Sequence, residues 1–337
     1  MTTALPSRSF DHDVFVHDAD EGYIAALVPL LQGALERSEA ATAVVSSSNA
    51  TLLAKALGAQ ANRVEFISAE GWYMDPVTTI TAYDTMLATA PVGKRNFVIG
   101  EVQFGGEPAA WTAWTRYESL LNNALSGYDA HVVCPYDRRV LPPAVVEDAL
   151  RTHPFVVDAT ARQASGSYAE PELVIPSLPA TVDVPERAPD LEIRLKRSLR
   201  EARHLFSAIT ASAGFGREHT EELTLAINEI ATNALTHGRG PGLMQLWVDP
   251  EGLTCVISDH GAGASPAIGY KPPPLGSTSG YGLWLSRRIF DRVDTLAEPD
   301  GFRVALFASS TSAPAVTRAK TPDHHIRVCA SSTDNPI

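Results

Sequence analysis

The stretch that decides the fold of the C-terminal part of this chain spans residues 228–238 and reads NEIATNALTHG. Apolar residues recur through it and just before it with the period of one helical face: Leu223, Ile227, Ile230 and Ala234. Glu229, Asn233 and His237 follow one another at a spacing of four, so they stack along an adjoining face of the same helix. Gly238 is expected to end this helix, as a C′ glycine does.

The pair Glu229 and Asn233 can divide two chemical tasks. The side-chain oxygen of Asn233 is a neutral hard ligand of the kind that Mg²⁺ accepts beside waters and substrate phosphates. The carboxylate of Glu229 can orient or deprotonate an attacking hydroxyl group as a general base. Taken alone, the segment is explained equally well by a surface helix with an ordinary Glu and Asn.

A second motif follows an apolar run and reads ISDHGAG over residues 257–263. Asp259 stands at the end of the expected strand, where its carboxylate can accept a hydrogen bond from the exocyclic amine of adenine. Gly261 and Gly263 let the backbone turn closely beneath a base. A single D-x-G-x-G is weak on its own, because many strands end in Asp and Gly.

A third motif, GYGL at residues 280–283, opens a helix expected at 281–290. A helix that starts behind glycines presents free N–H groups and a partial positive charge to a phosphate. Residues 265–279, between the second and third motifs, contain three consecutive prolines and are expected to form a mobile lid over a triphosphate. The chain has no G-x-x-x-x-G-K-[ST], so a P-loop is excluded.

The order and spacing of these motifs resemble the GHKL superfamily of ATPases and kinases, with the Bergerat (HATPase_c) fold. The resemblance implies a two-layer α/β sandwich over residues 191–310 that binds ATP and Mg²⁺. It implies that Asn233 holds Mg²⁺, Asp259 binds adenine and Glu229 is the general base. The other residues that it implies at the nucleotide are Gly261, Gly263, Gly280, Tyr281, Gly282 and Leu283.

Within that superfamily, the wording EIATNALTHG looks like the anti-sigma-factor serine/threonine kinase branch. This branch implies a sigma factor as partner, or a STAS-domain anti-anti-sigma protein phosphorylated on a serine. One alternative is a non-catalytic anti-sigma binding module in which ATP only shapes the partner surface. Another is a sensor histidine kinase with an atypical acceptor, for which His204 is the best-placed residue; His219 lies too close to Glu229 on the same helix.

The N-terminal part alternates between short β-rich runs and amphipathic helical runs. Strands are expected at residues 14–17, 42–46, 64–67, 96–102 and 130–134. Helices are expected at residues 21–37, 50–57, 76–88, 108–125 and 142–152. This alternation predicts an α/β domain with a mostly parallel sheet covered on both faces.

The remaining segments complete the predicted organisation. Residues 159–190 are rich in proline and are expected to be a linker, of which residues 173–175 and 180–184 could pair as an edge strand of the next domain. In the second domain, helices are expected at residues 191–213 and 217–236, with strands at 243–248, 253–258 and 302–307. Residues 311–337 are expected to be a disordered tail.

Short motifs before the linker resemble those of MEDS-type sensory domains over residues 8–158. These motifs are FDHD at residues 10–13, IGE at 99–101, RYE at 116–118 with Asn122, and CPYD at 134–137. The resemblance implies a RecA-like core without a phosphate loop.

In open α/β sheets, ligands bind beyond the carboxyl ends of strands, so a pocket for an unknown small ligand could use His17, Glu101, Glu118, Tyr136 and Asp137. Structural pairing of Glu101 and Asp137 with Arg116 or Arg138 is favoured slightly, and a metal or haem site of His12 with Cys134 is the least favoured interpretation.

The composition limits which kinds of partner and which cellular compartment are expected. The 337 residues carry a net charge of −12, and this acidic balance speaks against binding to nucleic acid or an anionic membrane. Three separated cysteines without a CxxC pair indicate a reducing compartment, and no apolar run approaches the length of a membrane span. We therefore expect a cytoplasmic signalling regulator. Formation of a homodimer is left open.

Overall fold

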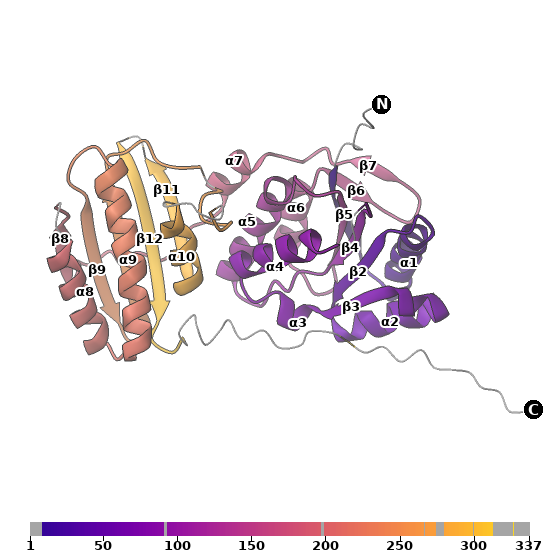
Figure 1. The fold of residues 1–337 in the computed structure, drawn as a ribbon, viewed down its shortest axis with the longest axis horizontal. Coiled ribbons are helices and arrows are strands. Elements are labelled where there is room, and N and C mark those ends of the chain that lie inside the picture. The colour runs from indigo at the N-terminus through magenta and orange to yellow at the C-terminus, as the bar shows by residue number, and fades with distance from the viewer. Residues whose placement is uncertain are drawn as a thin grey trace, which may run out of the picture. The chain divides into compact units, whose positions relative to one another are not determined.

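The computed structural model describes residues 9–90, 93–196, 199–265, 267–273, 280–298, 300–312 and 326 (Figure 1). The chain divides into two compact units, one of Met1–Val174 with Pro322–Ile337 and the other of Ile175–Thr321.

The N-terminal unit is built on a seven-stranded sheet with the order β3-β2-β4-β5-β1-β6-β7. Every neighbouring pair is parallel except β6 and β7, which are antiparallel. The strands are β1 (Phe10–His17), β2 (Ala40–Val45), β3 (Val64–Ser68), β4 (Asn96–Gly100), β5 (Ala130–Asp137), β6 (Phe155–Val157) and β7 (Arg162–Ala164). The predicted, mostly parallel sheet is confirmed.

Helices cover both faces of this sheet (Figure 1). One face carries α1 (Asp20–Glu36) and α2 (Ser47–Leu57), and the other carries α4 (Pro76–Ala88), α5 (Pro108–Ala124) and α6 (Pro143–Thr152). The short helices η1 (Gly58–Arg63) and α3 (Ala69–Trp72) flank β3. The two faces follow from right-handed crossovers, because the chain moves along the sheet one way from β1 to β3 and back from β3 to β5. Central strands covered on both faces are mostly apolar, and all of β4 is buried.

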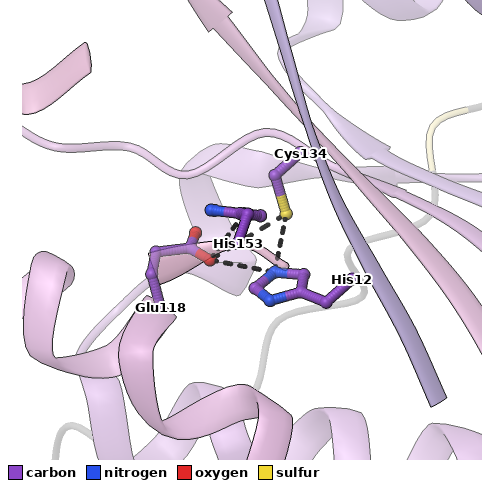
Figure 2. Close-up of side chains that lie close together, drawn as sticks. All are labelled: His12, Glu118, Cys134 and His153. Atoms are coloured by element: carbon purple, nitrogen blue, oxygen red, sulfur yellow. Dashed lines mark hydrogen bonds and ion pairs between the residues drawn. The ribbon is translucent and has the colours of Figure 1, made fainter. Parts of the chain in front are cut away.

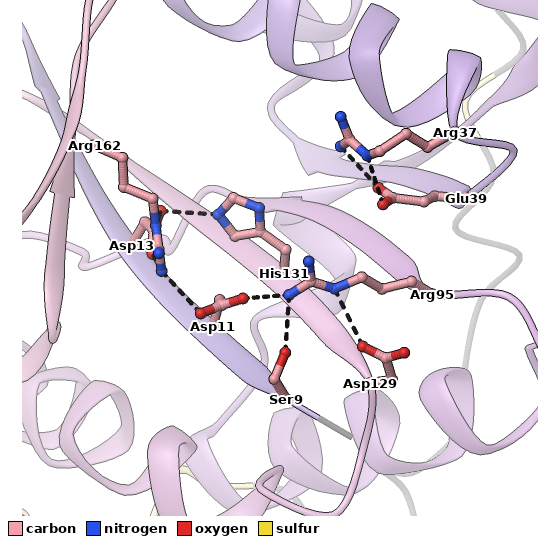
Figure 3. A network of polar contacts seen from close by, with 9 residues as sticks. All are labelled: Ser9, Asp11, Asp13, Arg37, Glu39, Arg95, Asp129, His131 and Arg162. Atoms are coloured by element: carbon pink, nitrogen blue, oxygen red, sulfur yellow. Dashed lines mark hydrogen bonds and ion pairs between the residues drawn. The ribbon is translucent and has the colours of Figure 1, made fainter. Parts of the chain in front are cut away.

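A polar network at this sheet ties its last strand to its centre (Figure 3). Asp13 of β1 is fully buried and accepts hydrogen bonds from Arg162 of β7 at 2.6 and 2.8 Å. His131 of β5 lies 2.8 Å from the same carboxylate. Burial alone would raise the pKa of Asp13, but the hydrogen bonds from His131 and Arg162 outweigh it and lower that pKa to about 2. The short strand β7 is therefore held by charge as well as by its backbone pairing.

The second unit is a two-layer sandwich, as predicted. Its antiparallel sheet has the order β11-β12-β10-β9-β8. The strands are β8 (Leu191–Arg194), β9 (Leu243–Asp249), β10 (Gly252–Asp259), β11 (Arg292–Glu298) and β12 (Gly301–Ser309). The helices α8 (Arg200–Ser212), α9 (Arg217–His237) and α10 (Tyr281–Ile289) form the other layer (Figure 1).

The start of this unit differs from the prediction. Residues 191–194, expected to begin a helix, form the edge strand β8 and pair with β9. Their side chains alternate, with Leu191 and Ile193 half-buried and Glu192 and Arg194 exposed, which is the period of a strand and not of a helix. The helix α8 begins only at Arg200.

The proline-rich segment also differs in detail. The edge strand lies outside residues 173–175 and 180–184, and the segment instead contains β7, the short helix α7 (Pro171–Val174) and a 3₁₀ turn, η2 (Ile175–Ser177). The backbone amides of Thr181 and Val182 donate to the carboxylate of Asp294 on β11. These contacts attach the last part of the segment to the second sheet.

Two predictions fall partly or mostly outside the described residues. Of the expected lid, residues 266 and 274–279 are not described, and of the expected tail only residues 311, 312 and 326 are. The backbone amide of Ile326 donates to the carbonyl of Phe66 on β3 at 2.9 Å, and its side chain packs against the N-terminal core.

Candidate functional site

The helix α9 carries the first motif. Its apolar stripe packs on the second sheet, with Leu223, Ile227, Ile230 and Ala234 buried. This anchoring leaves Glu229 and Asn233 half-buried on the adjoining face. Among the described residues, no hydrogen bond or ion pair engages either side chain, so both are available to a ligand.

The first turn of α10 lies directly against these two residues. A Cβ atom added to Gly282 would stand 2.7 Å from Asn233 Nδ2 and 3.3 Å from Glu229 Cβ, so any larger residue would displace the Asn233 side chain. Gly280, just before the helix, has a φ of +93°, a left-handed conformation that favours glycine. The first N–H groups of α10, which have no partner inside a helix, therefore begin beside a carboxylate and a carboxamide.

The second motif meets the carboxyl end of α9. Asp259, at the end of β10, accepts a hydrogen bond from the backbone amide of Gly261 at 2.6 Å. A Cβ atom on Gly238 would lie 2.8 Å from Asp259 Cβ and 2.2 Å from the carbonyl oxygen of Ala234. Gly238 ends α9 as expected, but its φ of −71° is not the left-handed conformation of a C′ glycine. The glycine is needed there for close approach to Asp259.

The other predicted nucleotide residues fall into two groups. Gly261 belongs to the same junction, since a Cβ atom on it would lie 2.8 Å from the carbonyl oxygen of His237, and Gly263 turns with a φ of +82° beside the ring of Phe302. Tyr281 is 37% exposed at the start of α10, whereas Leu283 is buried in the core. Thus Tyr281 can meet a ligand directly, and Leu283 anchors the helix.

ATP with Mg²⁺ fits these residues. Glu229 and Asn233 offer oxygen atoms, the donor type that Mg²⁺ prefers, next to the unpaired N–H groups that suit a phosphate. Asp259 lies against Gly238, directly after the carboxyl end of α9 and further along than Glu229 and Asn233, which suits a molecule with a triphosphate at one end and a base at the other.

The residues predicted to line a pocket in the N-terminal unit lie in two separate groups. His17, Glu101 and Asp137 lie at or next to the carboxyl ends of β1, β4 and β5. The carboxylate of Glu101 accepts from the backbone amide of Ser46 and from Asn49 Nδ2, and so caps the start of α2. Asp137 pairs with Arg139, at 2.7 Å.

Glu118 and Tyr136 belong to the opposite face of the sheet, because adjacent residues of a strand point to opposite faces and Tyr136 directly precedes Asp137 on β5. Glu101 instead pairs with Ser46 and Asn49, and Asp137 pairs with Arg139. The expected pairing of these two acids with Arg116 or Arg138 is not among their contacts in the described residues.

Glu118 belongs to a buried cluster of four side chains (Figure 2). His12, Glu118, Cys134 and His153 are each at most 2% exposed, and one ligand atom from each lies within 4.8 Å of all the others. Burial lowers the pKa of His12 to about 4 and that of His153 to about 3, so both imidazoles are neutral at neutral pH. Burial also raises the pKa of Glu118, to about 7. The sequence had pointed to His12, Glu118 and Cys134 but not to His153.

The two histidines considered as phosphate acceptors lie in different surroundings. His219 is 3% exposed, and its ring packs edge-on against Phe215. His204 is exposed on α8. Burial thus removes His219 as an acceptor and leaves His204.

Comparison with known families agrees with this division. The family model "MEDS: MEthanogen/methylotroph, DcmR Sensory domain" matches residues 11–154. The family model "Histidine kinase-like ATPase domain" matches residues 194–307. The chain is therefore a MEDS sensory domain fused to a histidine kinase-like ATPase domain, the composition of a signalling ATPase. No curated protein matches the chain. Over the described residues, none of the helices combines the length and apolar character that crossing a membrane requires.

Proposed function

We propose that the C-terminal domain is an ATP- and Mg²⁺-dependent protein serine kinase of the anti-sigma-factor type. Its substrate is a serine of a STAS-domain anti-anti-sigma protein, and the MEDS domain controls the reaction through a small ligand. The observation that supports the proposal is the approach of Gly282 to Glu229 and Asn233, which places a helix N-terminus beside a base and a metal ligand. A cytoplasmic location and a sigma factor as second partner belong to the same proposal.

Each residue has one task in this reaction. The N–H groups at the start of α10 bind and orient phosphate oxygens. Asn233 supplies a neutral oxygen to the metal, which when bound neutralises charge on the phosphates. Glu229 accepts the proton of the serine hydroxyl as that oxygen attacks the γ-phosphorus, the bond to the bridging β–γ oxygen breaks, and ADP leaves. Asp259 accepts from the amine of adenine and so selects it over guanine.

A serine on a partner suits this geometry better than His219. The ring of His219 is buried on α9, the helix that also carries Glu229. A hydroxyl group on a separate protein can instead approach the half-buried carboxylate of Glu229 from solvent.

The test is incubation of the full chain with labelled ATP, Mg²⁺ and a cognate STAS protein. Phosphoserine on the partner, lost in Glu229→Gln but kept in Glu218→Gln, supports the kinase; Glu218 is an exposed acid on the same helix. Tight nucleotide-dependent binding without transfer would identify a non-catalytic anti-sigma module. Acid-labile phosphate on the chain itself, abolished by His204→Gln, would identify a histidine kinase.

A further inference from the structure

We propose that His12, Glu118, Cys134 and His153 form a closed, four-coordinate site for a divalent transition-metal ion of the Zn²⁺ type within the MEDS domain. The four residues come from β1, α5, β5 and the position directly after α6. Their side chains converge on one point inside the domain (Figure 2).

Hydrogen bonds fix the orientation and tautomer of His12. Asn122 Nδ2 donates to the carbonyl oxygen of Thr152 at 3.0 Å, which turns Asn122 Oδ1 towards His12 Nδ1, 3.2 Å away. Because this oxygen can only accept, the ring hydrogen of His12 is on Nδ1. The lone pair of His12 Nε2 is therefore directed into the cluster.

His153 is held in the same way. Its Nδ1 lies 2.8 Å from the carbonyl oxygen of Ala149, so Nδ1 carries the hydrogen and Nε2 carries the lone pair. No described residue makes a hydrogen bond to His153 Nε2, although this atom is buried. An acceptor that orients one ring nitrogen while the other faces a shared centre is the arrangement found around metal-binding histidines.

Three of the distances between ligand atoms match a tetrahedral site, and the fourth, between Cys134 and Glu118, is longer. With bonds of about 2.0–2.1 Å to N and O and about 2.3 Å to S, the edges are about 3.3 Å between N and O and about 3.5 Å where S takes part. Glu118 Oε2 lies 3.2 Å from His12 Nε2 and 3.4 Å from His153 Nε2. Cys134 Sγ lies 3.4 Å from His12 Nε2 and 4.0 Å from Glu118 Oε2.

Binding would adjust one part of this geometry. The rings of His12 and His153 have their centroids 3.9 Å apart, closer than a tetrahedral ion would hold them. A bound ion would therefore spread these rings, and so move β1 slightly relative to the end of α6.

Charge explains why a cation belongs at this point. Without one, two imidazole lone pairs face the same carboxylate oxygen in a place that water does not reach. A divalent ion with a thiolate, a carboxylate and two neutral imidazoles has no net charge, which keeps the cost of burial low. Metal binding displaces protons: the thiol of Cys134 and the carboxyl group of Glu118, where it is protonated, release their protons to solvent.

The donor set selects the ion. Two imidazole nitrogens, a thiolate and a carboxylate suit Zn²⁺, whereas Mg²⁺ and Ca²⁺ prefer oxygen alone. Four protein ligands leave no open position, so the ion is structural and joins the elements that carry it. The convergence of four buried side chains on one point also favours a single ion over the open faces that a haem iron requires.

The experiment uses the full chain expressed in medium with Zn²⁺ or Co²⁺, so that the buried site can fill during folding. We expect one ion per chain by elemental analysis and, for Co²⁺, the intense d–d bands of a tetrahedral ion together with a thiolate charge-transfer band. Cys134→Ala should remove the charge-transfer band, and Cys255→Ala, which alters a buried cysteine of the other domain, should keep it.

His153→Gln provides a second variant, expected to weaken metal retention during dialysis against a chelator at least tenfold. Substoichiometric metal in the wild-type chain, or a charge-transfer band that survives Cys134→Ala, would overturn the proposal and leave a proton-sharing cluster. These readouts do not depend on ATP or on a partner, so they stand apart from the test of the kinase.

Discussion

The substitution Gly282→Ala tests the nucleotide site through one added methyl group. The new Cβ atom would lie 2.7 Å from Asn233 Nδ2, 3.3 Å from Glu229 Cβ and 3.6 Å from the backbone carbon of Glu229. The closest of these atoms is the end of a side chain, so the carboxamide of Asn233 rotates away while α10 keeps its position.

The expected cost falls on binding and much less on folding. Displacing Asn233 removes one ligand interaction of a charged centre, about 1.5–3 kcal/mol. At about 1.4 kcal/mol for each factor of ten, the Kd for Mg·ATP should rise about 10- to 150-fold. Stability should change by no more than about 1 kcal/mol, because the crowding at Glu229 is offset by the better helix propensity of alanine.

Calorimetric titration of Mg·ATP and thermal unfolding measure the two effects on the same samples. The matched control is Gly216→Ala, at the start of α9, where an added Cβ meets nothing within 4 Å and φ is −61°. Wild-type affinity in Gly282→Ala would refute the placement of Asn233 at the metal. A loss of stability as large as the loss of binding would refute the displacement of a side chain alone.

Three further predictions concern other residues. Glu229→Gln should lower the phosphotransfer rate about 10²- to 10⁴-fold while calorimetry shows retained ATP binding; an unchanged rate would exclude it as the base. Gly238→Ala should destabilise the ATPase domain and weaken ATP binding together, because its Cβ would meet the carbonyl oxygen of Ala234 at 2.2 Å and Asp259 at 2.8 Å; an unaffected melting temperature would contradict this. Asp13→Asn should destabilise the MEDS domain by about 2 kcal/mol, less than for a fully buried ion pair because Arg162 is 35% exposed. Hydrogen exchange of the β1 amides measures that change, and unaltered protection would show that the network is dispensable.

Strong local signals were enough to predict many elements. The helix expected at residues 76–88 is observed as Pro76–Ala88, because Asp75 accepts hydrogen bonds from the amides of Val77 and Thr78 and a proline follows at the first helical position. The nucleotide motifs were likewise visible, since each one is local. In the structure these motifs meet at α9, an arrangement that agrees with the resemblance to the GHKL superfamily.

Weak local signals were interpreted wrongly or missed. Residues 191–194 were assigned to the helix that follows them, because an alternation of only four residues is too short to be decisive without the pairing with β9. The strand β11, Arg292–Glu298, has little apolar periodicity and is ordered by its pairing with β12. Such segments take their conformation from hydrogen bonds to a distant partner, which no local pattern encodes.

The sequence by itself determined the two kinds of domain, because periodicity and short motifs act over a few residues of chain. Only the tertiary structure decided which polar residues meet. Cys134 and His12, 122 positions apart, are joined by parallel pairing of β5 with β1. His153 joins them because α6 ends against the same face, whereas strand alternation sends Asp137 to the other. These meetings depend on register and crossover handedness, which are properties of the assembled sheet.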